Sequence, residues 1–137
     1  MLPLELVTAY QNADYYVLKK VPFKFKIGVF SVDLKNLLKE NRVKTGYLIS
    51  AYNPRSQPTS QIQNNKKHRL LNNSLIKNNS LFYETVSKDP LGKWPYEYGF
   101  IVLNSSKKRA IELGIEFRQN AIVFVDYKAF PRLILLR

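Results

Sequence analysis

The sequence contains no cysteine and only one histidine among its 137 residues. The absence of cysteine excludes a disulfide framework, a thiolate zinc site and a cysteine nucleophile, and it agrees with a reducing compartment. A single histidine, His68, is too few for the familiar histidine-rich transition-metal sites. We therefore expect neither a metal site nor a cofactor.

Long hydrophobic runs are also missing. The longest apolar tail, at 133–136, is far too short to cross a membrane. Glu5 stands where a secretory signal would carry Lys or Arg, and no apolar stretch of signal-peptide length follows it. We expect a soluble, cytoplasmic protein without a membrane partner; the sequence leaves its oligomeric state open.

Acidic residues are scarce, because 10 Asp and Glu oppose 22 Lys and Arg, which gives a net charge of +12. Such a charge favours a nucleic acid or an acidic protein as partner. The alternative is compositional drift, since the abundance of both Lys and Asn is the bias expected from AT-rich coding DNA. The candidate residues for nucleic-acid contact are Lys66, Lys67, Arg69, Lys107, Lys108 and Arg109.

Hydrophobic residues make up 45% of the chain and aromatic residues 13%, enough for one packed core. Apolar periodicity predicts helices at 4–13, 32–41, 59–79 and 107–117, and strands at 15–18, 23–27, 47–52, 81–86, 98–103, 121–125 and 133–136. Ser31 and Ser105 or Ser106 are expected N-caps. The order predicts a single α+β domain over 1–137, with a mixed, mainly antiparallel sheet and three to four helices packed on it.

Two short patterns allow more than one interpretation. Phe23 and Phe25 alternate with Lys24 and Lys26, which favours a strand with its Phe side chains in the core over a sheet that stacks bases. His68, with lysines and an arginine around it, is expected to be a solvated helix residue and a poor proton acceptor.

The strand at 47–52 is apolar almost throughout, which indicates burial on both faces, and it ends abruptly in Asn53-Pro54-Arg55-Ser56. An Asn before Pro is driven out of the helical region, so Asn53 could serve only to stabilise a turn. Arg55 and Ser56 add a cation and a hydroxyl, which near a helix start can hold a phosphate or a carboxylate. No glycine-rich phosphate loop accompanies them.

Two later segments carry further polar candidates. Trp94-Pro95-Tyr96-Glu97 places the only Trp in a loop before a strand, where its ring could plug the core or stack on a ligand. Glu97 could bind a donor such as Arg55, Arg118 or a ligand amine. Arg118-Gln119-Asn120-Ala121 could be a helix C-cap with Asn120 in the left-handed conformation.

Together these segments resemble the bacterial DUF3293 family of uncharacterised proteins. That family's pattern is a strand that ends in Ala-Trp-Asn-Pro, a Ser, a helix that bears an Asn, then Trp-x-Glu and Gln-x-Ala. The resemblance runs from about Glu5 to Asp126 and matches Asn53, Asn64, Trp94, Glu97 and Gln119. Gln63 departs from the pattern, because the family often has an acidic residue there, and Tyr98-Gly99 stands where it often has a small hydroxyl residue.

The resemblance names no activity, so three hypotheses stay open. The first is a binding protein whose polar strand-end site recognises a nucleotide, a nucleic acid or another anionic partner. The second is an enzyme acting on a nucleotide or phosphate ester, with Glu97 as acid/base and Arg55 or Arg118 steadying charge. The third is an interaction protein or toxin-antitoxin component that binds an acidic partner. The ligand-site candidates are Asn53, Arg55, Ser56, Asn64, Trp94, Glu97 and Gln119.

Overall fold

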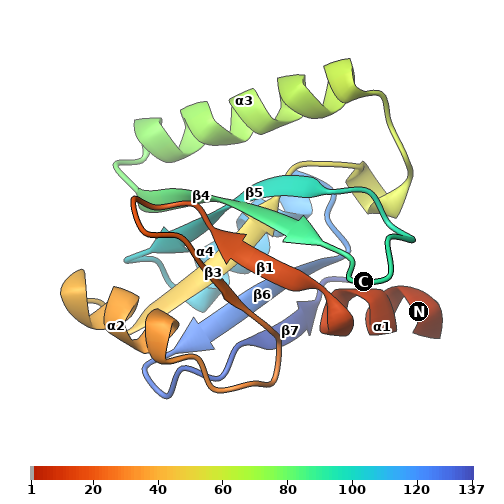
Figure 1. Ribbon diagram of the computed structural model, residues 1–137. Helices are drawn as coiled ribbons and strands as arrows, with labels where there is room; N and C mark the ends of the chain where they lie inside the picture. Colours follow the sequence, from red (N-terminus) through yellow and green to blue (C-terminus); the bar gives the residue numbers. More distant parts are fainter. Residues whose placement is uncertain (1) are drawn as a thin grey trace.

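The computed structural model describes residues 2–137 and contains the predicted helices and strands in the predicted order (Figure 1). The helices are α1 (Leu4–Asn12), α2 (Val32–Glu40), α3 (Gln61–Lys77) and α4 (Lys107–Glu116), with a short 3-10 turn at Pro54–Ser56. The strands are β1 (Asp14–Val17), β2 (Phe23–Phe25), β3 (Thr45–Ser50), β4 (Leu81–Lys88), β5 (Glu97–Leu103), β6 (Ala121–Asp126) and β7 (Arg132–Leu135).

The strands form one curled sheet in the order β2-β1-β4-β5-β3-β6-β7. Every pairing within residues 2–137 is antiparallel, so the α+β class is confirmed and the mixed character expected of the sheet is absent from this part of the chain. Short loops join β4 to β5 and β6 to β7, and only antiparallel neighbours can be joined so briefly.

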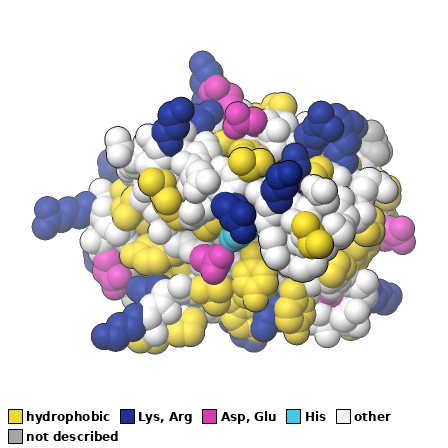
Figure 2. Space-filling view, turned by 90° about the horizontal axis from the view of Figure 1, so that it is seen from above, with side chains coloured by type: hydrophobic (Ala, Val, Ile, Leu, Met, Phe, Trp, Pro, Cys, Tyr) yellow, Lys and Arg dark blue, Asp and Glu magenta, His cyan; other side chains and the backbone are white. Residues whose placement is uncertain are grey.

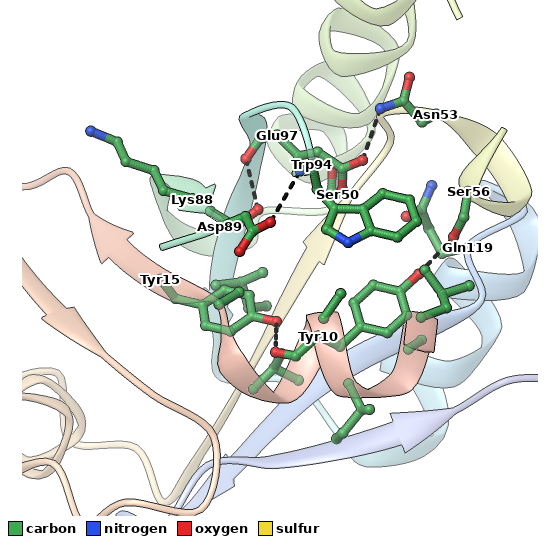
Figure 3. Close-up of a pocket in the computed structure, with 18 of the residues that line it drawn as sticks. Tyr10, Tyr15, Ser50, Asn53, Ser56, Lys88, Asp89, Trp94, Glu97 and Gln119 are labelled. Carbon is green, nitrogen blue, oxygen red and sulfur yellow. Dashed lines mark hydrogen bonds between the residues drawn. The ribbon is translucent and has the colours of Figure 1, made fainter. Parts of the chain in front are cut away.

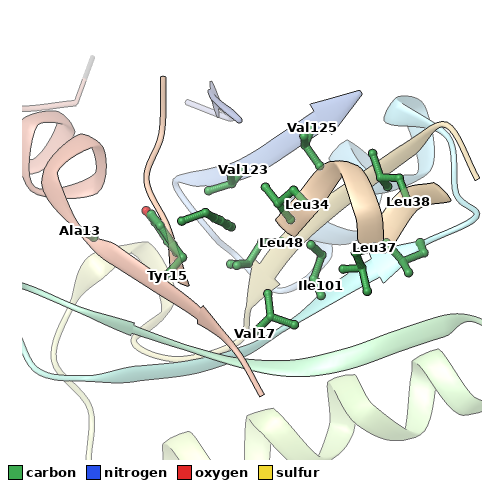
Figure 4. Packing of buried hydrophobic residues seen from close by; sticks show 12 residues of the cluster. Ala13, Tyr15, Val17, Leu34, Leu37, Leu38, Leu48, Ile101, Val123 and Val125 are labelled. Atoms are coloured by element: carbon green, nitrogen blue, oxygen red, sulfur yellow. The ribbon is translucent and has the colours of Figure 1, made fainter. Parts of the chain in front are cut away.

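Both faces of the sheet are covered, as the apolar character of β3 predicts. On one face α2 packs Leu34, Leu37 and Leu38 against the sheet (Figure 4). The sheet residues of this cluster include Val17, Leu48, Ile101, Val123 and Val125. On the other face α3 and α4 pack Leu71, Leu75, Ala110 and Leu113 against Tyr47, Ile49, Phe100, Val102, Ile122 and Phe124. β3 therefore contributes alternate side chains to two cores.

Serine side chains begin three of the helices. The hydroxyls of Ser31, Ser60 and Ser106 accept hydrogen bonds from backbone N–H groups in the first turns of α2, α3 and α4. At the end of α4 the left-handed residue is Arg118, with φ 56°, so the left-handed conformation predicted for Asn120 was wrong. Arg118 and Gln119 donate to the Ile115 and Gly114 carbonyls and complete the cap before Asn120 is reached.

The Phe and Lys residues of β2 lie on the sides that the sequence predicted. Phe25 is buried, Phe23 packs against the same core and Lys24 is exposed. The phenylalanines therefore fill the interior and are not free to stack on bases.

The end of β3, the start of β5 and the start of β6 meet at one end of the sheet, beside α1 (Figure 1). α2 and the β6–β7 loop lie at the opposite end. Within residues 2–137 no helix has the length and apolar character needed to span a membrane.

Candidate functional site

The turn after β3 is held in an unusual backbone conformation. Asn53, Arg55 and Ser56 all have positive φ, at 44°, 57° and 60°. Residues other than glycine rarely adopt this backbone conformation. Such residues persist only where surrounding contacts fix them. The backbone N–H of Arg55 donates to the Arg118 carbonyl at 2.7 Å, which ties the turn to the end of α4.

Asn64 of α3 locks this turn from behind. The backbone N–H of Asn53 donates to Asn64 Oδ1 at 2.9 Å, and Asn64 Nδ2 donates to Asn53 Oδ1 at 3.0 Å. Thr59 completes the cluster by donating its backbone N–H to Asn53 Oδ1 and its hydroxyl to Asn64 Oδ1. Both asparagine side chains are buried. The two asparagines matched by the family pattern therefore contact each other directly.

The side-chain amide of Asn53 also reaches Glu97, the first residue of β5. Asn53 Nδ2 donates to Glu97 Oε2 at 2.8 Å. Burial raises the pKa of the Glu97 carboxyl above its usual value, and the hydrogen bond from Asn53 opposes this rise. Within residues 2–137 no basic side chain forms an ion pair with Glu97. The arginine partner considered from the sequence is therefore replaced by an asparagine.

A second polar group lies across from Glu97. Ser56 Oγ is 2.8 Å from the hydroxyl of Tyr10 on α1, and it accepts a hydrogen bond from Asn120 Nδ2 at 2.8 Å. Asn120 is buried and so supports Ser56 from below. Burial also raises the pKa of Tyr10, while the hydrogen bond with Ser56 acts in the opposite direction. The Tyr10 hydroxyl is therefore neutral at physiological pH.

The loop between β4 and β5 brings in Trp94. Asp89 organises this loop by accepting backbone N–H groups from Leu91, Lys93 and Trp94 at 2.8–3.1 Å. These hydrogen bonds, the one from Leu91 above all, lower the pKa of Asp89. The Trp94 side chain is 39% exposed, too open for a core residue. Of the two alternatives for Trp94, the ring faces a pocket and does not plug the core.

These groups surround one pocket, which is open to solvent and has a cavity volume of about 110 Å³. Trp94, Tyr10, Glu97 and Ser56 all line the pocket, and Figure 3 shows Glu97 bonded to Asn53 near the Trp94 ring and Ser56 bonded to Tyr10. The floor is apolar and is made by Ala13, Tyr15, Leu48, Val123 and Leu133.

The charged side chains that line the pocket are two carboxylates, of Asp89 and Glu97, and one ammonium, of Lys88. Lys88 Nζ lies 4.9 Å from the ring centroids of both Tyr16 and Tyr96, and its side chain extends away from the pocket (Figure 3). Although the chain has a net charge of +12, this pocket is therefore acidic.

Five of the seven predicted ligand-site residues line this pocket: Asn53, Ser56, Trp94, Glu97 and Gln119. Gln119 is oriented by donating its Nε2 to the Tyr52 and Phe117 carbonyls, which leaves its amide oxygen to accept from a ligand. Asn64 stands behind Asn53 and does not line the pocket. Arg55 and Arg118 also lie outside the pocket lining, so neither arginine is placed to steady charge beside Glu97.

Sequence reasoning missed the contribution of α1 and of Asp89. Tyr10 was interpreted only as an apolar position of a helix, because nothing local indicates which distant groups a helix will cover. Asp89 had a usable signal, since Asp89-Pro90-Leu91-Gly92 is the kind of sequence in which an Asp side chain accepts from the backbone of a turn.

The predicted basic residues come from two helices, α3 and α4. Lys66, Lys67 and Arg69 belong to α3, where both lysines are exposed, and Lys107 and Lys108 are exposed at the start of α4. Arg109, on α4, is half-buried in a small hollow beside the C-terminal end of α3. This end of α3 lies about 16 Å from Lys66 along the helix axis. In the view onto α3, Lys and Arg side chains are scattered among polar, acidic and apolar ones (Figure 2).

His68 is not the solvated helix residue that the sequence suggested. Its ring stacks on Phe100 with centroids 4.4 Å apart, and its Nε2 lies 2.8 Å from Glu84 Oε2. Only 17% of its side chain is exposed. The α3 register turns His68 toward the sheet, while its basic neighbours face the solvent.

Comparison with known protein families gives a match over the part of the chain that carries the candidate site. The family model described as "Protein of unknown function (DUF3293)" matches residues 49–122, which contain every ligand-site candidate and more than half of the chain. This match is shorter than the resemblance noted from the sequence, because α1, β1, β2 and α2 lie outside it. No curated protein and no solved structure is significantly similar to the chain.

Among residues 2–137 no group of acidic or histidine side chains is arranged to hold a metal ion.

Proposed function

The chain belongs to the DUF3293 family of proteins of unknown function, and from the geometry of its pocket we propose that it binds a small planar ligand that carries N–H donors, such as the base of a nucleotide. The observation that carries the proposal is the Glu97 carboxylate, which stands in a largely apolar pocket with one oxygen on Asn53 and without a basic partner within residues 2–137. Such an acceptor favours a ligand donor over an anion.

The pocket walls fit a planar ring. Trp94 and Tyr10 approach the same space from different elements, and aromatic side chains bind the faces of heterocycles. The amide oxygen of Gln119 and the hydroxyls of Tyr10 and Ser56 add polar contacts at the edge. In this proposal the base of a nucleotide is recognised and its phosphate stays at the mouth, because both lining carboxylates would repel it.

Binding of nucleotides tests this proposal. We expect guanosine monophosphate, whose base presents adjacent N–H donors on one edge, to bind more tightly than ribose 5-phosphate, which has the phosphate and no base. Isothermal titration calorimetry of both compounds, together with adenosine, cytidine and uridine monophosphates, measures the difference. Equal affinity for ribose 5-phosphate, or no binding by any of the nucleotides, would contradict the proposal.

The raised pKa of Glu97 supports a second candidate function, an enzyme that acts on a nucleotide or phosphate ester with Glu97 as acid/base. Phosphate release from nucleoside monophosphates, followed by a colorimetric assay, tests it. Glu97→Gln should abolish turnover and retain most of the protein's stability, because glutamine can still accept from Asn53. Turnover that survives this substitution would exclude the acid/base role.

The exposed cations of α3 and α4 keep the hypotheses of nucleic-acid and acidic-protein binding open at a separate surface. Substitution of Lys66, Lys67 and Arg69 by Gln should flatten the salt dependence of binding to labelled DNA or RNA. An unchanged salt dependence would exclude this face of α3 as a nucleic-acid contact.

A further inference from the structure

The end of the sheet opposite the pocket carries a cluster of exposed apolar side chains on two connecting segments. This tip patch consists of Val29, Phe30 and Val32 before and at the start of α2, and Tyr127 and Phe130 in the β6–β7 turn. The five side chains are between 45% and 62% exposed. Single exposed apolar residues are ordinary, but a contiguous cluster of aromatic and β-branched side chains indicates a contact surface.

The two segments that carry the tip patch are fastened together. Gly28 N–H donates to the Pro131 carbonyl at 2.7 Å, and Ser31 N–H donates to the Ala129 carbonyl at 3.0 Å. The rings of Phe30 and Phe130 lie with centroids 5.5 Å apart. Ala129 is fully buried beneath the turn. The exposed side chains are thus presented by a fixed scaffold.

Lysines accompany the patch. Lys35 Nζ lies 6.0 Å from the centroid of the Phe30 ring, and Lys128 is exposed between Tyr127 and Phe130. Two acidic side chains also lie near the patch, because Asp126 precedes Tyr127 and accepts the Lys128 N–H, and Asp33 stands in the first turn of α2. The chain as a whole adds a net charge of +12.

We propose that the tip patch is a contact site for an anionic lipid surface. Aromatic side chains at loop tips enter the boundary between headgroups and acyl chains, and neighbouring lysines contact acidic headgroups. The patch lies on two adjoining turns, which suits a soft planar surface better than a rigid protein partner that would need a matching cavity. This inference is independent of the ligand pocket. It also differs from the expectation of no membrane partner, which rested on the lack of a spanning segment, because surface contact requires none.

Charge alone could bring so basic a protein to vesicles, so the test must detect insertion of the patch. The chain has a single Trp, Trp94, at the opposite end of the sheet. In the double variant Trp94→Phe, Phe130→Trp, the only indole lies in the tip patch. Vesicles of phosphatidylcholine with about one third phosphatidylserine should shift its emission to shorter wavelength, whereas the wild-type emission from Trp94 should not move.

Sedimentation with the same vesicles at physiological salt gives a second measurement. Phe30→Ser combined with Phe130→Ser should weaken binding at least about tenfold, because two apolar side chains lose their contact with the lipid. Ile62→Ser, which removes an exposed apolar side chain from α3, is the matched control and should bind within about twofold of wild type. Circular dichroism confirms that each variant is folded.

Two results would overturn the proposal. Failure of the wild-type protein to bind the vesicles at physiological salt would exclude lipid as the occupant and leave an acidic protein to be tested. Binding that is unaffected by the serine substitutions, without an emission shift from the indole introduced in place of Phe130, would assign the attraction to net charge alone.

Discussion

Asn53 and Asn64 hold each other by two reciprocal hydrogen bonds, one through the backbone N–H of Asn53 and one through the amide of Asn64. This pair joins the left-handed turn after β3 to α3, and it also orients the Asn53 amide toward Glu97. The Asn53–Asn64 pair therefore supports the left-handed backbone of the turn and positions the Asn53 amide that binds the Glu97 carboxylate.

Asn64→Ala should destabilise the protein by about 2–4 kcal/mol, since it leaves buried polar groups of Asn53 without partners. The neighbouring Asn65 supplies the control, because it is exposed and bonds to Gln61. Asn65→Ala should cost no more than about 0.5 kcal/mol. Urea unfolding measures the free energy of unfolding of both variants. Equal losses in the two variants would contradict a stabilising role of the Asn53–Asn64 pair.

Glu97 should make stability depend on pH in a definite direction. Its pKa is raised in the folded protein, so the folded state binds this proton more tightly than the unfolded state does. The resulting stability is present below the ordinary pKa of a glutamate and is lost as pH rises through the folded pKa. Glu97→Gln removes the titrating group and should therefore gain stability relative to wild type as the pH is raised from about 4 to about 7.

Unfolding midpoints in urea at several pH values give the Glu97 comparison. Glu112→Gln is the matched control, because Glu112 is exposed on α4 and forms no ion pair within residues 2–137. A gap between Glu97→Gln and wild type that stays constant with pH would show that burial does not perturb this carboxyl.

Gly99 should not tolerate a side chain. A Cβ atom at this position would lie 2.4 Å from the Ile49 carbonyl oxygen, a backbone atom of the neighbouring strand β3. We expect Gly99→Ala to cost about 3 kcal/mol or more, since β3 and β5 would have to separate. At Gly114 the closest atom is the flexible Leu136 side chain, so Gly114→Ala should cost much less. Thermal unfolding compares them, and a mild effect at Gly99 would contradict this strand packing.

Tyr10 should tether α1 to the pocket. None of the α1 residues is buried, and the Tyr10 hydroxyl joins the helix to Ser56. Tyr10→Phe removes this bond while the ring remains, at a cost of about 0.5–1.5 kcal/mol. Amide hydrogen exchange in α1 should become faster, with exchange in α3 unchanged. Unaltered exchange in α1 would mean that the Tyr10–Ser56 hydrogen bond does not hold the helix in place.

Local patterns predicted the elements well, because α2 and α4 carry clear apolar periodicity and serine caps and β3 is a continuous apolar run. They also brought Asn53, Glu97 and Gln119 to one end of the sheet, since each follows or precedes a core strand. Side-chain direction was harder. Arg55 looked like a site residue because it follows Asn53-Pro54, yet it lies outside the pocket in a turn with three positive φ values. Nothing in a sequence without glycine there signals such a conformation.

The sequence also did not predict which residues far apart in the chain contact each other. An arginine was one of the partners considered for Glu97, but the sheet register places Asn53 beside it. α1 closes the pocket through Tyr10, which precedes its partner Ser56 by 46 residues. His68 faces Phe100 for the same reason, because the face of a polar helix that docks is decided by tertiary packing.

The most direct test of the proposed ligand site is a titration of Trp94 fluorescence with guanosine monophosphate in wild type, Glu97→Gln and Glu84→Gln. A hydrogen bond to a charged acceptor contributes about 1.5–3 kcal/mol, so Glu97→Gln should weaken binding roughly 10- to 100-fold while Glu84→Gln leaves it unchanged. Equal affinities for all three proteins, or no response of Trp94 to the nucleotide, would contradict the assignment of Glu97 as the group that recognises the base.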